Sequence, residues 1–175
     1  MATKKTAIFT LTERVTLSST AVTSATIDLS SYVDVGDRQG IQIHSVDYIT
    51  QGTSAGESLL ATFAGDDAEV QVQVMDLNRG GLVFANDRAL VSSMRLRIDN
   101  GGGIYEAADM FPDNYGKGSD DGRFVVNEGL FIEAKTSHIG TNESANITVR
   151  VNASIVTLSS KDFMSLAIAS TAADN

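Results

Sequence analysis

Alternating apolar and polar residues fill the second half of the segment from Gly122 to Ser160, and this pattern constrains the fold more than any other feature. The odd positions are apolar and the even ones polar: Ile147, Val149, Val151, Ala153 and Ile155 against Thr148, Arg150, Asn152 and Ser154. Because successive side chains of a strand point to opposite faces, the pattern predicts a long strand. A shorter alternation over 130–135 precedes it, and the polar segment 137–144 separates the two. The sequence therefore predicts an antiparallel hairpin.

Further segments with strand periodicity are spread along the chain. Clear alternation covers 6–17, 25–29, 69–77 and 92–99. In 41–50 the apolar phase changes at His44–Ser45, where we expect either a β-bulge or a strand that passes between differently buried environments. Shorter strands are expected over 56–65 and 80–85. In total the pattern predicts about nine or ten short strands without helices between them, which is typical of an all-β antiparallel sandwich or barrel.

Two segments depart from the strand pattern. Residues 100–122 are rich in Gly, Asp and Asn and contain Pro112. This stretch is longer than most structureless connections, so we expect a long loop that makes contacts. After the last strand, Ser159 and Asp162 have the spacing of a capping box, and apolar residues then recur at helical spacing, which predicts a helix over about residues 160–169.

Length and charge bound the possible functions. A chain of 175 residues suits a single β-sandwich domain over 1–175, with an extended N-terminal strand at 6–17. Acidic residues outnumber basic ones 22 to 13, and the net charge of −9 repels phosphate backbones, so no direct nucleic-acid binding is expected. No apolar run is long enough for a transmembrane helix, and the N-terminus does not read as a secretory signal.

No residue pattern indicates a reaction, so we predict no enzyme activity and no cofactor. The sequence has no cysteine and two histidines, His44 and His138, too few for the several imidazoles of a β-barrel metal site. No G-x-S-x-G nucleophile motif is present. Asp113, Asp120 and Asp121 are candidate calcium ligands, but their spacing is not that of an EF-hand, and solvated loop carboxylates are the simpler interpretation.

Three asparagines, Asn142, Asn146 and Asn152, satisfy the N-x-Ser/Thr pattern for glycosylation. In a sequence rich in Asn, Ser and Thr, such matches are expected by chance. The pattern would matter only in a secreted protein, so we do not expect modification.

The layout combines an N-terminal extended strand, the strand GIQIHSVDYIT at 40–50, a long Gly/Asp-rich insertion, and GLFIEAKTS followed by NITVRVNASIVTLSSKDFMSLAIA. In this layout the chain resembles single jelly-roll major capsid proteins of small icosahedral viruses. The resemblance spans most of the chain and rests on pattern and size. It implies an antiparallel β-sandwich of jelly-roll type with a short C-terminal helix, located in the virion.

The resemblance also implies partners. The subunit would self-assemble through side-to-side contacts with copies of itself, and a minor capsid or pentameric vertex protein would be a further partner; membrane contact is left open. Many such proteins that touch their genome carry a basic N-terminal arm, and here only Lys4 and Lys5 stand in its place. We therefore expect the genome to be neutralised by something else, or to be separated from the shell by a membrane or another protein.

The surfaces expected to carry assembly are the N-terminal strand, the long loop and the C-terminal helix. Their candidate contact residues are Phe9, Leu11, Tyr105, Phe111, Tyr115, Phe163 and Leu166. Two alternatives remain. A cell-surface filament or pilus subunit would donate its N-terminal strand to a neighbour's sheet. A carbohydrate-binding β-sandwich would usually show exposed aromatic residues, whereas this chain has no Trp and four Tyr.

Overall fold

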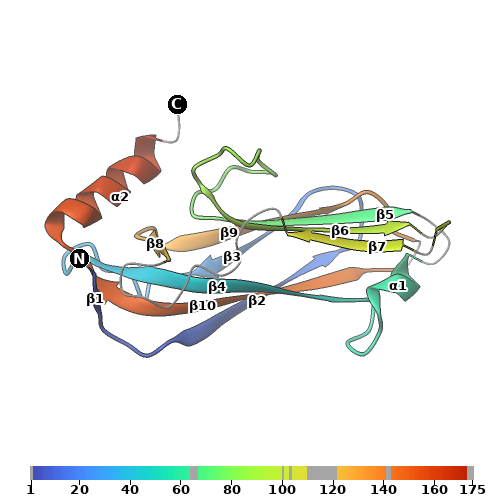
Figure 1. Cartoon of the computed structure of the whole chain (residues 1–175), viewed down its shortest axis with the longest axis horizontal. Helices are drawn as coiled ribbons and strands as arrows, with labels where there is room; N and C mark the ends of the chain where they lie inside the picture. The colour runs from blue at the N-terminus through green and yellow to red at the C-terminus, as the bar shows by residue number, and fades with distance from the viewer. Residues whose placement is uncertain are drawn as a thin grey trace.

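The computed structural model describes residues 2–63, 67–99, 101–102, 104–109, 122–140 and 143–172, with 60–61, 104–109 and 170–172 described by their backbone alone. Its strands form two five-stranded antiparallel sheets that lie face to face (Figure 1). Two helices, α1 (Leu59–Thr62) and α2 (Ser160–Ala172), lie at opposite ends of this sandwich. The predicted all-β sandwich with a short C-terminal helix is confirmed.

The first sheet is built around β10, which pairs with β4 along one edge and with β2 and β1 along the other. Its strands are β1 (Thr3–Lys4), β2 (Phe9–Leu17), β4 (Gln39–Gln51), β8 (Arg123–Val125) and β10 (Ala145–Thr157). The second sheet has the order β3-β9-β5-β6-β7. Its strands are β3 (Thr23–Asp28), β5 (Ala68–Met75), β6 (Leu90–Asp99), β7 (Ile104–Asp109) and β9 (Gly129–Thr136).

The pairing of the strands follows a jelly roll. When β1 and β7 are set aside, the first strand pairs with the last (β2 with β10), the second with the seventh (β3 with β9), the third with the sixth (β4 with β8) and the fourth with the fifth (β5 with β6). These are the pairs of one long hairpin wrapped around a barrel. Wrapping then brings β10 against β4 and β9 against β5, as observed, and produces two packed sheets.

The predicted hairpin between β9 and β10 is wrong. Both strands exist where alternation placed them, but β9 lies in the second sheet and β10 in the first, so the connection 137–144 crosses between the sheets. Each strand already has a partner on both edges, which leaves no edge for the other. Alternation reports which face of a strand is buried, and it carries no information about the strand's neighbours.

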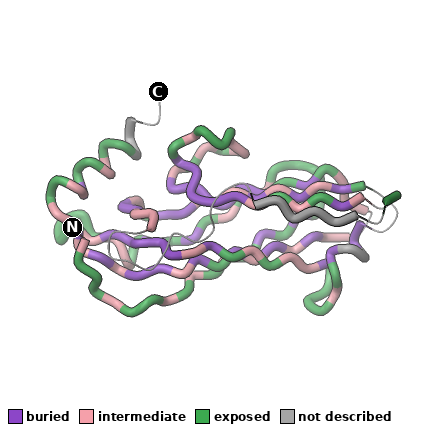
Figure 2. Tube along the Cα trace, viewed as in Figure 1, coloured by how far each residue is buried: buried purple, intermediate pink, exposed green. Residues whose placement is uncertain are grey.

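The core lies between the two sheets, and buried residues recur along the strands of both (Figure 2). It consists mainly of aliphatic side chains. On β10 the odd residues Ile147, Val149 and Val151 are fully buried, as the alternation predicted. Val70 and Val72 of β5 face them from the second sheet. Burial of each such side chain contributes about 1.5–3 kcal/mol, so the paired inner faces are the main source of stability.

The β-bulge predicted at His44–Ser45 is confirmed. Along β4 and β10 the register runs from Ser45 opposite Asn152 to Ile43 opposite Ala153, which leaves His44 without an opposite residue. The His44 side chain is buried, and its Nε2 lies 2.9 Å from Oγ of Ser154. The bulge therefore lets the strand change its buried face between Ile43 and Val46, both of which lie in the core.

Three local predictions need correction. Residues 56–65 were expected as a strand but contain α1, because Leu59 and Phe63 are buried one helical turn apart. Residues 80–85 form a loop, in which Gly80 has a φ of 67° that a strand does not accommodate. The expected long loop 100–122 contains strand β7, paired with β6. Residues 110–121 lie outside the described residues.

The C-terminal helix begins at the predicted residue and runs three residues further than expected, to Ala172. The Ser159 hydroxyl donates to the Asp162 carboxylate at 2.7 Å and accepts from the Asp162 N–H at 3.2 Å, as a helix cap should. This hydrogen bond lowers the pKa of the Asp162 carboxyl. Beyond this cap, Phe163 packs in a small second cluster with Val156 and Leu158 of the preceding strand and its end.

A candidate assembly surface at one end of the sandwich

One end of the sandwich gathers most of the exposed apolar side chains. Because the strands are antiparallel, the N-terminal residues, the connections 29–38, 76–89 and 126–128, and helix α2 all lie at this end (Figure 1). Of the seven exposed large apolar side chains of the described residues, five belong to these segments: Ile8, Val35, Phe84, Met164 and Ile168. Phe84, at the tip of the connection between β5 and β6, is the most exposed at 87%.

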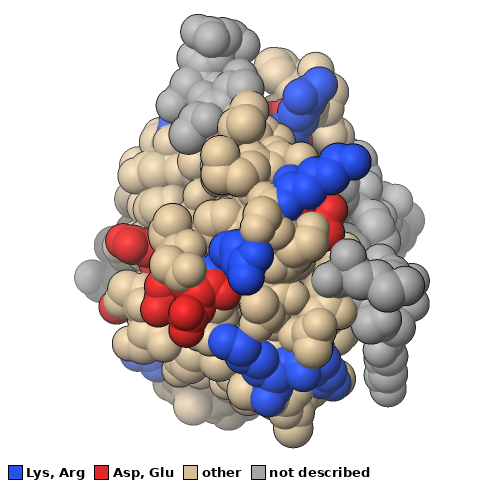
Figure 3. Space-filling model, turned by 90° about the vertical axis from the view of Figure 1, so that its left-hand side faces the viewer, with Lys and Arg blue, Asp and Glu red and all other residues tan. Residues whose placement is uncertain are grey.

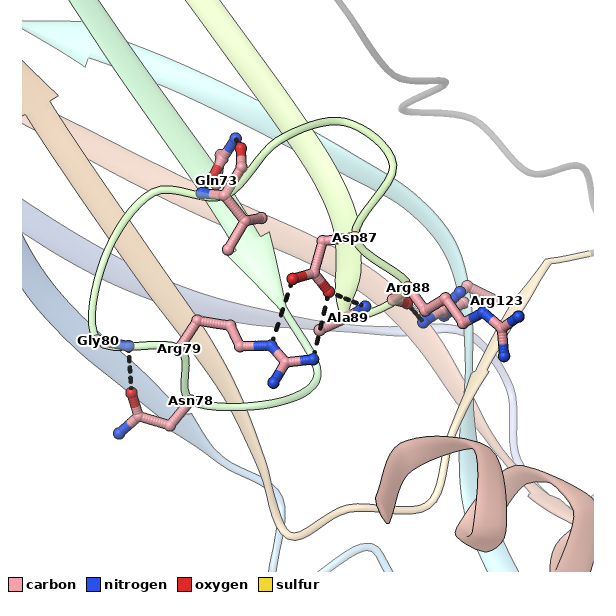
Figure 4. A network of polar contacts seen from close by, with 9 residues as sticks. Gln73, Asn78, Arg79, Gly80, Asp87, Arg88, Ala89 and Arg123 are labelled. Carbon is pink, nitrogen blue, oxygen red and sulfur yellow. Dashed lines mark hydrogen bonds and ion pairs between the residues drawn. The ribbon is translucent and has the colours of Figure 1, made fainter. Parts of the chain in front are cut away.

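The connection 76–89, called the β5–β6 loop below, is held by side chains rather than by strand pairing. At its far half, the backbone N–H of Val83 donates to Oε1 of Gln73 at 2.7 Å, and Nε2 of Gln73 donates to the Val83 carbonyl at 2.9 Å (Figure 4). The amide of Gln73 thus takes the place of a neighbouring strand for Val83. The next residue, Phe84, accepts a hydrogen bond from the Asp87 N–H at 3.0 Å, which closes a turn around the tip.

An ion pair crosses the middle of the β5–β6 loop. Nε of Arg79 lies 3.4 Å from Oδ2 of Asp87, and Oδ1 of Asp87 accepts from the Ala89 N–H at 2.8 Å (Figure 4). Both charged side chains are largely buried, with 18% and 23% of their surface exposed. This pair joins the rising and returning halves of the loop.

Arg123 of β8 closes the base of the same loop. Its Nη2 donates to Oδ2 of Asp76 at 2.7 Å and to the carbonyl of Arg88 at 2.6 Å. Asn127 adds a hydrogen bond from Nδ2 to the Asp76 carbonyl at 2.6 Å. Burial raises the pKa of the Asp76 carboxyl, and the charge and hydrogen bond of Arg123 oppose this rise only in part. Arg123 of the first sheet and Asn127 of the connection 126–128 therefore hold both ends of a loop that joins two strands of the second sheet.

The hydrogen bonds and ion pairs of the β5–β6 loop explain how its backbone can keep the exposed Phe84 in one position. Residues 80–86, Gly-Gly-Leu-Val-Phe-Ala-Asn, contain no charge, while the residues around them are tied by hydrogen bonds and an ion pair. A loop ordered in advance loses little conformational entropy when it binds. An aromatic side chain held in this way has the properties of an interface anchor.

Helix α2 offers a second apolar group beside this loop. Phe163, Leu166 and Ala167 face the sandwich, whereas Met164 and Ile168 lie one turn apart on the opposite face, 58% and 59% exposed. Between Phe163 and Ala172 the helix carries no charged residue. A helix that is apolar on both faces is normally covered on both.

A pocket of about 350 Å³ lies between the β5–β6 loop, β8 and α2. Its apolar lining includes Leu77, Ala89, Phe124, Leu166 and Ala169, and its charged lining comes from Asp76, Arg88 and Arg123. Figure 3 looks onto this end of the molecule: Lys and Arg side chains are spread over it, and the largest group of Asp and Glu side chains lies left of the centre.

The structure places four of the residues predicted to carry assembly against their own chain. Phe9 stacks on Tyr32 with ring centroids 5.3 Å apart, and Leu11 packs against the core. Phe163 of α2 is buried against Val156 and Leu158, and Leu166 of the same helix is half-buried. Tyr105 lies in β7, where the backbone alone is described. Phe111 and Tyr115 fall outside the described residues, as do the calcium candidates Asp113, Asp120 and Asp121.

Sequence reasoning missed Phe84, Met164 and Ile168. Phe84 lay in a segment interpreted as a strand, where an apolar residue is expected to be buried. The signal that identifies the loop is the run of turn-forming residues, with Asn78 and Asp87 on either side of Gly80 and Gly81. The Asn78 side chain does accept from the Gly80 N–H, at 3.0 Å.

Two of the three asparagines of the N-x-Ser/Thr patterns have structural partners, and the third, Asn142, lies outside the described residues. Asn146 uses both ends of its amide, donating to the Gly52 carbonyl at 2.7 Å and accepting from Thr16 at 2.8 Å. Asn152 does the same with Ser45 and Thr10. Among the described residues no group of three or more His, Asp or Glu gathers in a way that could hold a metal ion. Within the same residues, no helix is long and apolar enough to span a membrane.

Comparisons with known proteins show weak structural likeness and no match in sequence. No protein-family model matches the chain, and no curated protein matches it in sequence. A solved structure of Desmodium yellow mottle tymovirus is similar with a TM-score of 0.32 and 9% sequence identity, covering 88% of this chain and 91% of that chain. At this TM-score the likeness does not establish a relation between the two proteins.

Proposed function

We propose that this chain is a structural subunit that assembles with copies of itself into the closed shell of a virion. The observation that carries the proposal is the structure of the β5–β6 loop. Two ion pairs, Arg123–Asp76 and Arg79–Asp87, and the amide of Gln73 fix this loop, while the Phe84 ring at its tip is exposed to solvent. Burying that ring in a contact would contribute about 1.5–3 kcal/mol. In a free monomer the same arrangement has no evident use.

The rest of the chain supports a rigid building block. A jelly roll with a core of aliphatic side chains and one loop end rich in apolar groups can repeat the same contact from copy to copy. Each contact is small, so the shell would be stable because many weak contacts act together. A minor capsid or vertex protein as a further partner, and a genome held away from direct contact, remain part of this proposal.

The filament alternative is less favoured because of where β2 lies. A donated strand should be separable from its own domain, but β2 pairs with β10 over nine residues and places Val15 and Leu17 in the core. Removing the strand would open the sandwich. Strand addition would therefore need the N-terminal residues before Phe9, which include only the two-residue strand β1.

Light scattering and negative-stain electron microscopy test the proposal together. The purified full chain should form closed particles of uniform size over some range of protein and salt concentration. Fibres would favour the filament alternative. A chain that stays monomeric at high concentration under all salt conditions would contradict self-assembly altogether.

A further inference from the structure

Resting on the proposed function, we propose that the ring of Phe84 from one copy enters the pocket between the β5–β6 loop, β8 and α2 of a neighbouring copy. The ring does not fill its own copy's pocket, since it is 87% exposed. The pocket lies at the base of the loop and beside α2, whereas Phe84 is at the loop tip. Each copy therefore carries both a protruding ring and a pocket that the ring of another copy can enter.

The lining of the pocket fits an aromatic ring. Leu77, Phe124 and Leu166 provide apolar contact surface, and the volume of about 350 Å³ leaves room for a ring together with part of its loop. Arg88 and Arg123 are part of the same lining. Guanidinium groups are attracted to the face of an aromatic ring, most strongly where water is excluded.

Charge also favours this occupant over a charged segment. Residues 80–86 carry no charge, so the loop tip brings no carboxylate toward Asp76 and no cation toward the two arginines. Asp76 is already paired with Arg123 at 2.7 Å. A neutral ring can enter without separating that pair, whereas an acidic peptide would compete with Asp76 for Arg123.

The position of ring and pocket on one chain explains why the contact can repeat. Every copy both gives a ring and receives one, so no copy needs a second kind of partner. Arg123 acts on both parts, because it lines the pocket and holds the base of the loop that carries Phe84. In the proposed contact, Arg123 of one copy holds the loop that carries the ring, and Arg123 of the other copy lines the pocket that receives it.

Cysteine cross-linking tests the contact directly, since the natural chain has no cysteine. The variants Ala85→Cys, which keeps the Phe84 ring beside the new thiol, and Ala169→Cys are prepared separately, each with a different mass tag, and mixed under the conditions that assemble the wild type. Both positions are exposed, so both variants should fold, which circular dichroism checks. A short bis-maleimide reagent should then join the two tagged chains. Ala85→Cys mixed with Ala55→Cys, an exposed site at the opposite end, is the matched control.

The outcomes separate this inference from the proposed function. Cross-linking of Ala85→Cys to Ala169→Cys at least several-fold above the Ala55→Cys control supports the contact. Assembly without that excess overturns the contact and leaves the shell intact. Failure of the wild type to assemble overturns the proposed function. If wild type but not Phe84→Ser floats with phosphatidylcholine–phosphatidylserine vesicles, and no cross-link forms, the partner of Phe84 is a lipid surface and the inference is wrong.

Discussion

The guanidinium of Arg123 lies 2.7 Å from the carboxylate of Asp76, although 47 residues separate the two in the chain. The same nitrogen donates to the carbonyl of Arg88, so one side chain from β8 holds the first and the last turn of the β5–β6 loop. Asp76 leaves the second sheet at the end of β5, and Arg123 belongs to the first. This pair therefore joins the two sheets at the end that presents Phe84.

Loss of this pair should destabilise the fold. In Arg123→Gln, the buried Asp76 carboxylate keeps its desolvation cost and loses its partner, so we expect the free energy of unfolding to fall by about 2 kcal/mol, measured by urea denaturation. Arg95→Gln is the matched control, since its ion pair with Glu69 is 44% and 31% exposed, and it should change stability by less than about 1 kcal/mol. Equal effects of the two variants would show that the Arg123 pair is not special.

The raised pKa of Asp76 predicts a pH dependence. The folded state binds this proton more tightly than the unfolded chain does, so the contribution of Asp76 is largest below the ordinary carboxyl pKa and is lost as pH rises through the folded value. Asp76→Asn stays neutral throughout. Its stability relative to wild type should rise between about pH 4 and pH 7. A relative stability that stays constant or falls over this range would contradict the raised pKa.

The cap of α2 should govern the order of that helix. Ser159→Ala removes the hydroxyl that accepts from the Asp162 N–H, and it should cost about 1 kcal/mol of helix stability. Faster hydrogen exchange confined to amides of α2 would register this loss. Ser165→Ala, at an exposed position inside the helix, is the control and should leave exchange unchanged or slower. Unchanged exchange in Ser159→Ala would mean that packing of Phe163 alone holds the helix.

The place of β2 in the core predicts how the chain responds to changes at its N-terminal strand. Leu17 is fully buried, so Leu17→Ala should lower the free energy of unfolding by about 2–5 kcal/mol. Thr12→Ala on the exposed face of the same strand should change it by no more than about 0.5 kcal/mol. Deletion of residues 2–17 should leave a chain that does not fold. A folded, monomeric deletion variant would instead revive the strand-donating filament.

The sequence predicts faces of strands well and their partners poorly. The alternation of β10 and the phase change at His44 depend on burial over neighbouring residues, and both were found as predicted. The partner of β9 depends on contacts with β3 and β5, far away in the chain, which local periodicity does not contain. The error over 80–85 has the same origin, because the Gln73 amide that holds Val83 is outside the segment.

The candidate surface was harder to predict than the fold for a related reason. Helix α2 was predicted from its cap and from the helical spacing of its apolar residues. The residues of that spacing, Phe163 and Leu166, also suggested the face that contacts a neighbouring copy. Phe163 and Leu166 pack on the chain's own strands, and the outward face belongs to Met164 and Ile168. Periodicity alone does not tell which of two apolar faces is covered, since that depends on how the helix is tilted against the sandwich.

Sedimentation velocity of Phe84→Ser tests the central claim, that this chain assembles through the end that carries the β5–β6 loop. Val22→Ser, an exposed apolar position at the opposite end, is the control. Wild type and Val22→Ser should assemble at the same concentration, and Phe84→Ser should remain a folded monomer until the concentration is at least about tenfold higher. Assembly of Phe84→Ser at the wild-type concentration, with Val22→Ser impaired instead, would contradict the account.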